Sequence, residues 1–237
     1  MSALTNFMTL SRYASHRDLW GRNGWTRKHR FAAMTAGFVG LRIDEDQFVI
    51  ELSKLFEEGC DRQLAEDTIR QMAAYVGYIH AAKAMSALDR VVARGGVAAE
   101  AAPISPEPSD EERYARGIED YNKLNPAALG TIRTAFDDLA PDLANLTFRA
   151  FGDVYAASRQ DLATRQIATV AGLGCMGGVA PQLRFHFGAA LNVGVTQDQL
   201  VEVILLIQFL AGMPAAYNAI VELKAAISSA GEPPPYR

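Results

Sequence analysis

One histidine has neighbours that could do acid–base chemistry. His186 follows Gln182 by four residues, so the two side chains share a face if this segment is helical. An imidazole can donate and accept a proton near neutral pH without a cofactor, and an amide could orient it or bind an enolate oxygen. A lone histidine is more often a hydrogen-bonded core residue. From the residues alone, both readings of His186 stay open.

Three further residues could bind an anionic substrate. Arg165 and Arg184 carry guanidinium groups, whose planar donors match a carboxylate. Arg184 lies only two residues from His186, which points it away from the histidine's face and favours a solvated position. Tyr155 offers an acidic hydroxyl, although a packed aromatic ring is the commoner role.

The elements that must position these residues read as helices, with no convincing alternating strand segment, so an all-α fold built of helical hairpins is expected. In the second part of the chain, helices are predicted near 162–175, 181–193, 197–210 and 215–228. Thr196 and Gln199 have the spacing of a capping box, and Pro214 suits a first helical turn.

The same pattern occurs earlier in the chain at an offset of 135 residues. Helices are predicted near 25–40, 46–58 and 80–93, and Asp61 is a plausible cap for the helix between them. The ungapped comparison of residues 30–88 with 165–223 gives 11 identities in 59 positions, against roughly five by chance. Three glycine pairs share this register: Gly37/Gly172, Gly59/Gly194 and Gly77/Gly212. An internal duplication is therefore predicted.

These observations give a division of the chain into three parts. Residues 1–94 form a first module, residues 95–112 a Pro- and Ala-rich linker, and residues 113–237 a second module. The copies differ where chemistry is expected, because Glu51 occupies the position of His186, while Arg30 and Gln47 repeat Arg165 and Gln182. This repetition favours a partly structural task for the arginine and the glutamine.

Several segments of the second module resemble the carboxymuconolactone decarboxylase family, which has the alkylhydroperoxidase-like fold. They are RGIEDY at 116–121, FGDVY at 151–155, LATR at 162–165, QLRFH at 182–186, GAALN at 188–192, GVT at 194–196 and GMPAAYNA at 212–219. The resemblance implies tandem helical modules of that fold. It further implies a ring of six modules with sites between subunits, which a homotrimer of this two-module chain would imitate.

The resemblance also implies a carboxy-lyase that uses His186 as its general acid or base. The expected substrate is a small carboxylated lactone or related cyclic acid, and the reaction is decarboxylation or an isomerisation or cyclisation. Gln182 and Glu51 are the other candidate catalytic residues, and Arg165, Tyr155 and Arg184 the candidate substrate-binding ones. Glu51 either belongs to a dead copy of the site or contributes to an altered or shared one.

Two other functions compete with this reading. A non-catalytic helical binding or assembly protein remains an alternative. A thiol peroxidase is disfavoured, because the redox branch of the family carries C-x-x-C where this chain has Val179-Ala-Pro-Gln182, and Cys175 stands alone. Gln166 replaces a glutamate that the redox branch often uses as a proton relay, next to the arginine of the L-x-x-R segment.

Composition limits the remaining possibilities. The net charge is −4 without a basic run, so no nucleic-acid partner is expected. No secretory signal and no membrane span are predicted, which makes a cytoplasmic location the default. The histidines and cysteines lack metal-ligand spacing, so neither a metal nor another cofactor is expected.

Overall fold

The computed structural model describes residues 22, 24–95, 108–126, 128–136, 138–156 and 158–229. These residues form eleven α-helices and no strand, which confirms the all-α prediction. The helices are α2 (Arg27–Leu41), α3 (Glu45–Glu57), α4 (Arg62–Val76), α5 (Tyr78–Arg94), α6 (Asp110–Leu124), α7 (Ala128–Phe136), α8 (Pro141–Ala156), α9 (Leu162–Met176), α10 (Ala180–Asn192), α11 (Gln197–Ala211) and α12 (Met213–Ser228). Most of the predicted linker lies outside the described residues.

The helices α2–α5 and α9–α12 repeat one another at the offset found in the sequence. Adding 135 to the bounds of α2, α3 and α4 gives the bounds of α9, α10 and α11. The predicted caps form as well: Asp61 accepts from the Leu64 amide, and Thr196 and Gln199 form a capping box. The equivalent glycines Gly59 and Gly194 both have positive φ just past a helix end. The helix bounds therefore match at the predicted offset, while the duplication and the module boundaries stay predictions.

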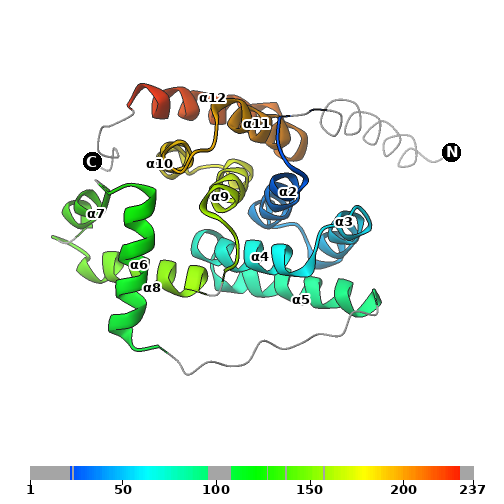
Figure 1. Cartoon of the computed structure of the whole chain (residues 1–237), viewed down its shortest axis with the longest axis horizontal. Helices are drawn as coiled ribbons and strands as arrows, with labels where there is room; N and C mark the ends of the chain where they lie inside the picture. The colour runs from blue at the N-terminus through cyan, green and yellow to red at the C-terminus, as the bar shows by residue number, and fades with distance from the viewer. Residues whose placement is uncertain are drawn as a thin grey trace.

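The two sets of helices meet through α2 and α9, which lie side by side at the centre of the molecule (Figure 1). A Cβ atom on Gly40 would overlap the carbonyl oxygen of Gly172, and one on Gly37 would lie 3.3 Å from Cys175 Sγ. The offset of 135 exchanges these two contacts, as a local two-fold axis between the central helices would. The backbones approach closely because glycine has no side chain at the crossing.

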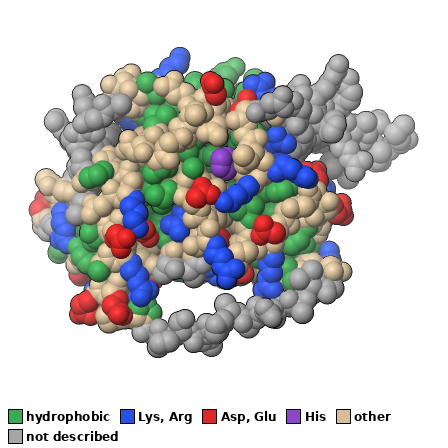
Figure 2. Space-filling view, viewed as in Figure 1, with side chains coloured by type: hydrophobic (Ala, Val, Ile, Leu, Met, Phe, Trp, Pro, Cys, Tyr) green, Lys and Arg blue, Asp and Glu red, His purple; other side chains and the backbone are tan. Residues whose placement is uncertain are grey.

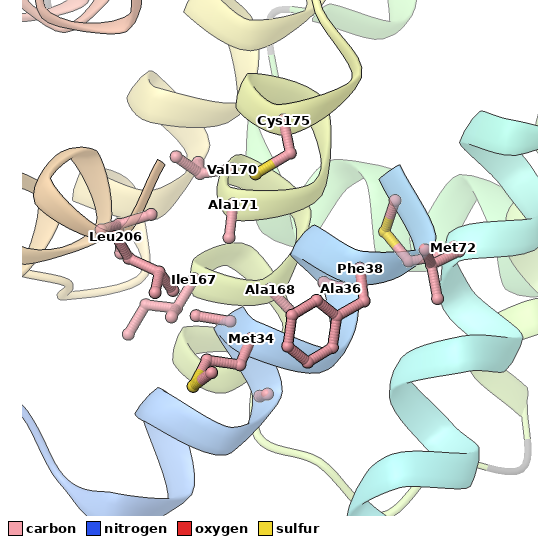
Figure 3. Close-up of a cluster of buried hydrophobic side chains, with 14 of the residues drawn as sticks. Met34, Ala36, Phe38, Met72, Ile167, Ala168, Val170, Ala171, Cys175 and Leu206 are labelled. Carbon is pink, nitrogen blue, oxygen red and sulfur yellow. The ribbon is translucent and has the colours of Figure 1, made fainter. Parts of the chain in front are cut away.

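The larger of two buried hydrophobic clusters among the described residues joins the two halves. Met34 and Phe38 of α2 pack near Ile167 and Ala171 of α9, with Leu206 of α11 on the other side of the pair (Figure 3). Both central helices are buried around most of their circumference, which explains their weak amphipathic patterning. The halves therefore share their buried surface instead of folding around two separate cores.

Helices α6, α7 and α8 precede α9 and were not predicted as separate elements. Helix α6 begins with a capping box between Ser109 and Glu112, and packs closely along α8, where a Cβ on Gly117 would overlap the Phe148 carbonyl. A second buried cluster joins α6 and α8 to α4 and α10. These helices consequently place residues of α8 beside α4 and α10.

The described surface carries charges of both signs. Acidic and basic side chains are interspersed on the face shown in Figure 2. Among the described residues, none of the helices combines the length and apolarity required to cross a bilayer.

Candidate functional site

His186 lies inside the protein, on the buried face of α10. The side chain is only 3% exposed, and its Nδ1 lies 2.9 Å from the Oε1 atom of Gln166 on α9. An amide oxygen only accepts hydrogen bonds, so Nδ1 carries the proton and Nε2 is left with a free lone pair. Burial lowers the pKa of His186 to about 3, and the imidazole is therefore neutral at physiological pH.

The residue that orients His186 is Gln166, and this corrects the expectation for Gln182. Gln182 lies in the first turn of α10 and is exposed. Positions four residues apart share a helix face, but the start of this helix projects beyond the protein interior while its middle is covered by α9. The sequence marks Gln166 only as a departure from the redox branch of the family.

Aromatic rings enclose the histidine on two sides. The rings of Phe185 and Tyr75 meet the imidazole edge to face, at centroid distances of 5.0 and 5.3 Å. Phe151 and Tyr121 extend the cluster, and Tyr121 stacks on Phe185 with an angle of 11° between the rings. Such an apolar enclosure weakens competition from water and strengthens the polar contacts within it.

Tyr155 lies in the same cluster, as the sequence analysis allowed. It is 4% exposed, and its hydroxyl oxygen lies 3.2 Å from that of Tyr75. Tyr75 belongs to α4, in the first half of the chain. Burial raises the pKa of both phenols, so both keep their protons at neutral pH.

Arg165 borders this cluster and has a visible structural task. Its guanidinium carbon lies 4.6 Å from the centre of the Tyr155 ring, and Nη2 donates to the Tyr155 and Ser158 carbonyls over 3.4 Å each. The equivalent Arg30 likewise donates to a carbonyl just before its helix, that of Arg22. The Nε atom of Arg165 is nevertheless buried without a hydrogen-bond partner, and this leaves a cationic donor available beside Tyr155.

Buried polar contacts attach the second half's loop to the first half. Gln71 of α4 donates from Nε2 to the Arg165 carbonyl at 3.0 Å and to the Thr169 hydroxyl at 3.2 Å. Gln160 donates to the Leu64 carbonyl and the Thr68 hydroxyl of the same helix. Removing either amide would leave buried groups unpaired, so these contacts hold α4 in register with α9.

The other two predicted residues lie away from His186. Arg184 forms an ion pair with Glu222 of α12, with 2.7 Å between Nε and Oε2, instead of facing the histidine. Glu51 accepts hydrogen bonds from Gln47 and Lys54 on its own helix. Figure 1 shows α3 and α10 on opposite sides of the central pair, so Glu51 does not join the site of His186.

Sequence reasoning missed Tyr75, Gln71 and Thr169. The repeat comparison could have pointed to the first two, because Leu210 and Leu206 stand at the positions equivalent to Tyr75 and Gln71. Where one copy has a polar residue and the other has an aliphatic residue at the equivalent position, the two side chains are expected to have different roles. Nothing in the local sequence of α4 shows that it faces α9.

A pocket of about 240 Å³ lies elsewhere, in the first half, between α2, α3 and α5. Its lining includes Phe38, Arg42, Phe48, His80 and Lys83, and none of the predicted site residues. Among the described residues, no three His, Cys, Asp or Glu side chains are grouped so that they could hold a metal ion. We therefore place the candidate site at His186, where titratable and hydroxyl side chains converge, and not at the pocket in the first half.

Comparison with known proteins agrees with this location. The family model described as "Carboxymuconolactone decarboxylase family" matches residues 141–225, which contain α8 to most of α12. A protein named 4-carboxymuconolactone decarboxylase from Acinetobacter baylyi (strain ATCC 33305 / BD413 / ADP1) is 33% identical over 114 residues. That alignment covers 47% of this chain and 84% of the relative.

Proposed function

The chain belongs to the carboxymuconolactone decarboxylase family, and we propose that it is a cofactor-independent lyase or isomerase acting on a small carboxylated lactone or related cyclic acid. The observation that carries the proposal is the buried, neutral His186, held by Gln166 within an aromatic enclosure. A decarboxylase-like function agrees with the family, and the reaction and substrate class are our inference.

The proposed reaction uses His186 as a proton carrier. Loss of carbon dioxide breaks the bond between the ring carbon and the carboxyl carbon, and its electron pair enters the conjugated system of the substrate. A proton must then restore that system at carbon. With Nδ1 bonded to Gln166, Nε2 can take up a proton from water and deliver it to the substrate carbon, so each turnover consumes one solvent proton, releases carbon dioxide and returns the imidazole to its neutral state.

Arg165 is the proposed partner of the substrate carboxylate. Its buried Nε atom has no hydrogen-bond partner, and its charge lies over the Tyr155 ring. An interaction that holds the carboxylate before it leaves also orients the breaking bond against the conjugated system. Arg184, committed to Glu222, has no part in this scheme.

The buried thiols agree with a reaction that does not use cysteine. Cys60 and Cys175 are both free and buried, and burial raises the pKa of each thiol to about 12. The thiolate is the reactive form of cysteine, and it is scarce at neutral pH when the pKa is so high. We therefore do not propose a peroxidase function.

The test compares His186→Gln with Glu51→Gln across a panel of small cyclic carboxylic acids, with turnover followed by carbon dioxide release and by product absorbance. General acid–base catalysis contributes about 10²- to 10⁴-fold, so kcat of His186→Gln should fall by at least about 100-fold. Glu51→Gln is the matched control at the equivalent position and should stay within about twofold of the parent. Turnover that survives in His186→Gln would contradict the proposed function.

We also propose that three chains assemble into a ring of six modules. Helix α12 exposes Met213, Tyr217 and Val221 at a spacing of four residues, which gives one apolar stripe along its outer side. Contact between copies would cover this stripe. Mass photometry should show a trimer, and a monomer at all concentrations would contradict the ring.

A further inference from the structure

Tyr75 is the only described polar side chain that the first half places against the imidazole of His186. Its ring contacts the imidazole at a centroid distance of 5.3 Å, and its hydroxyl reaches the Tyr155 hydroxyl at 3.2 Å. Tyr155 is buried, whereas Tyr75 keeps part of its surface accessible. The partly exposed member of the pair is therefore the one beside the histidine, and a small molecule could approach the pair from that end.

The hydrogen bonds around the pair leave a donor available. Two hydroxyl groups bring two protons, and their mutual bond uses one of them. Hydrogen bonding with Thr169 lowers the pKa of each phenol, against the larger rise that burial causes. Gln71 in turn donates to the Thr169 oxygen. Gln71, Thr169 and the two tyrosines therefore lie in one buried polar region between α4, α8 and α9, where hydrogen bonds are stronger than in water.

We propose that the paired hydroxyls of Tyr75 and Tyr155 bind the substrate oxygen on which negative charge develops. This inference rests on the proposed function and adds a substrate class to it: a planar cyclic acid in which an enol, ketone or lactone oxygen is conjugated with the carbon that loses its carboxyl group. The first half of the chain then supplies a catalytic group to the site in the second half.

The surroundings of the hydroxyl pair suit such an oxygen. Preorganised donors stabilise a developing oxyanion best in an enclosure from which water is excluded. The rings of Phe151, Tyr121 and Phe185 continue from the tyrosine pair as an aromatic wall, which a planar conjugated ring can pack against. Arg165 lies over the Tyr155 ring and supplies the positive charge that a carboxylate requires.

The first experiment measures kcat and KM for Tyr75→Phe and Tyr155→Phe, with Tyr78→Phe as the control. Tyr78 lies three residues further along the chain, is 60% exposed, and loses the same hydroxyl without touching the site. Removal of one oxyanion donor should lower kcat of each site variant by about 100-fold. KM should change less than threefold, and the double variant should lose less than the product of the single losses.

The second experiment needs no turnover. The probe is 4-hydroxy-3-nitrobenzoate, which combines a carboxylate with a phenol whose ionisation is visible by absorbance. The parent protein and Tyr78→Phe should bind its phenolate form, while Tyr75→Phe should bind it about tenfold more weakly. His186→Gln should retain binding, because the hydroxyl pair is intact.

These results separate the two proposals. If Tyr75→Phe matches the parent protein in both kcat and probe affinity, the hydroxyl subsite is wrong while His186 chemistry can stand. If His186→Gln keeps its turnover but Tyr75→Phe loses both turnover and probe binding, the subsite stands and the proposed role of His186 is wrong. A parent protein that does not bind the probe also overturns the subsite. Unchanged melting temperatures for the phenylalanine variants exclude a merely structural effect.

Discussion

The site around His186 and the equivalent position around Glu51 occupy matching places in two sets of helices, yet the polar contacts of the two residues differ. Gln166, which orients the histidine, corresponds to Phe31, and Tyr75 corresponds to Leu210. Glu51 itself pairs with Lys54 and Gln47 on its own helix. One set therefore holds an interconnected polar cluster, and the other holds apolar packing with a surface ion pair.

This difference shows how a two-fold arrangement can be kept while its chemistry becomes one-sided. The contacts between α2 and α9 serve both halves at once, because each central helix packs against the other half. The polar cluster needs α4 from the first half and α8, α9 and α10 from the second. The first half therefore contributes one side of the His186 site. This contribution does not depend on whether the equivalent position around Glu51 has any activity.

Disrupting the close contact between α2 and α9, which both halves share, should have the largest effect, and the quantity affected is the free energy of unfolding. Gly40→Ala should lower the free energy of unfolding by about 2 kcal/mol or more, because the new methyl group overlaps the backbone of Gly172, which cannot move aside as a flexible side chain would. Gly188→Ala in α10 is the control. Its new Cβ meets nothing within 4 Å, and a gain of about 0.5–1 kcal/mol is expected from the better helix former.

Urea titration of both glycine variants measures these changes, and activity on the best acid shows whether the His186 site depends on this contact. A Gly40→Ala protein as stable as the parent would show that the close approach of the central helices is not required.

The burial of His186 can be tested through the pH dependence of stability. Its folded pKa of about 3 lies below the value near 6.5 of an unfolded histidine, so between these values the unfolded chain binds more protons. Stability contributed by the neutral imidazole is fully present above about pH 6.5 and is lost as pH falls towards 3. Between pH 7 and 4.5 the parent should lose about 2 kcal/mol more than His186→Gln.

Chemical denaturation at the two pH values, with both proteins in the same buffers, measures this difference. Equal losses in parent and variant would mean that the imidazole is protonated in the folded protein near its ordinary pKa.

The smallest expected effect comes from an attempt to rebuild the second site. Glu51→His places an imidazole at the equivalent position, but Phe31 offers no acceptor for Nδ1 and Leu210 offers no hydroxyl. When Glu51→His is added to His186→Gln, kcat of the double variant should exceed that of His186→Gln alone by less than about twofold. Recovery of a larger share would show that the histidine alone, and not its surroundings, decides where the chemistry takes place.

The sequence predicted several elements closely and for local reasons. Helix ends at Asp61, Thr196 and the positive-φ glycines depend on nearby backbone groups, so short-range patterns were enough to place them. The expectation against a thiol peroxidase likewise depends on local sequence alone, namely the missing cysteine pair between 179 and 182.

Other expectations failed because they extended a local rule across the molecule. Gln182 shares a face of α10 with His186 by spacing, but only the middle of that face is covered by α9. Arg184 found its partner on α12, and Tyr75 reached the site from a helix more than one hundred residues away in sequence. Separations of this kind are set by helix packing, which one sequence does not reveal.

By itself, the sequence indicated the helices of the two matching sets, α2–α5 and α9–α12, their offset of 135 residues, and a histidine at position 186 where the first set has Glu51. Tertiary structure alone decided that Gln166 holds that histidine and that Tyr75 pairs with Tyr155 across the two halves. The reason is physical: caps and helical periodicity depend on contacts a few residues apart, whereas the packing of α2, α4 and α9 selects which distant side chains share one buried enclosure.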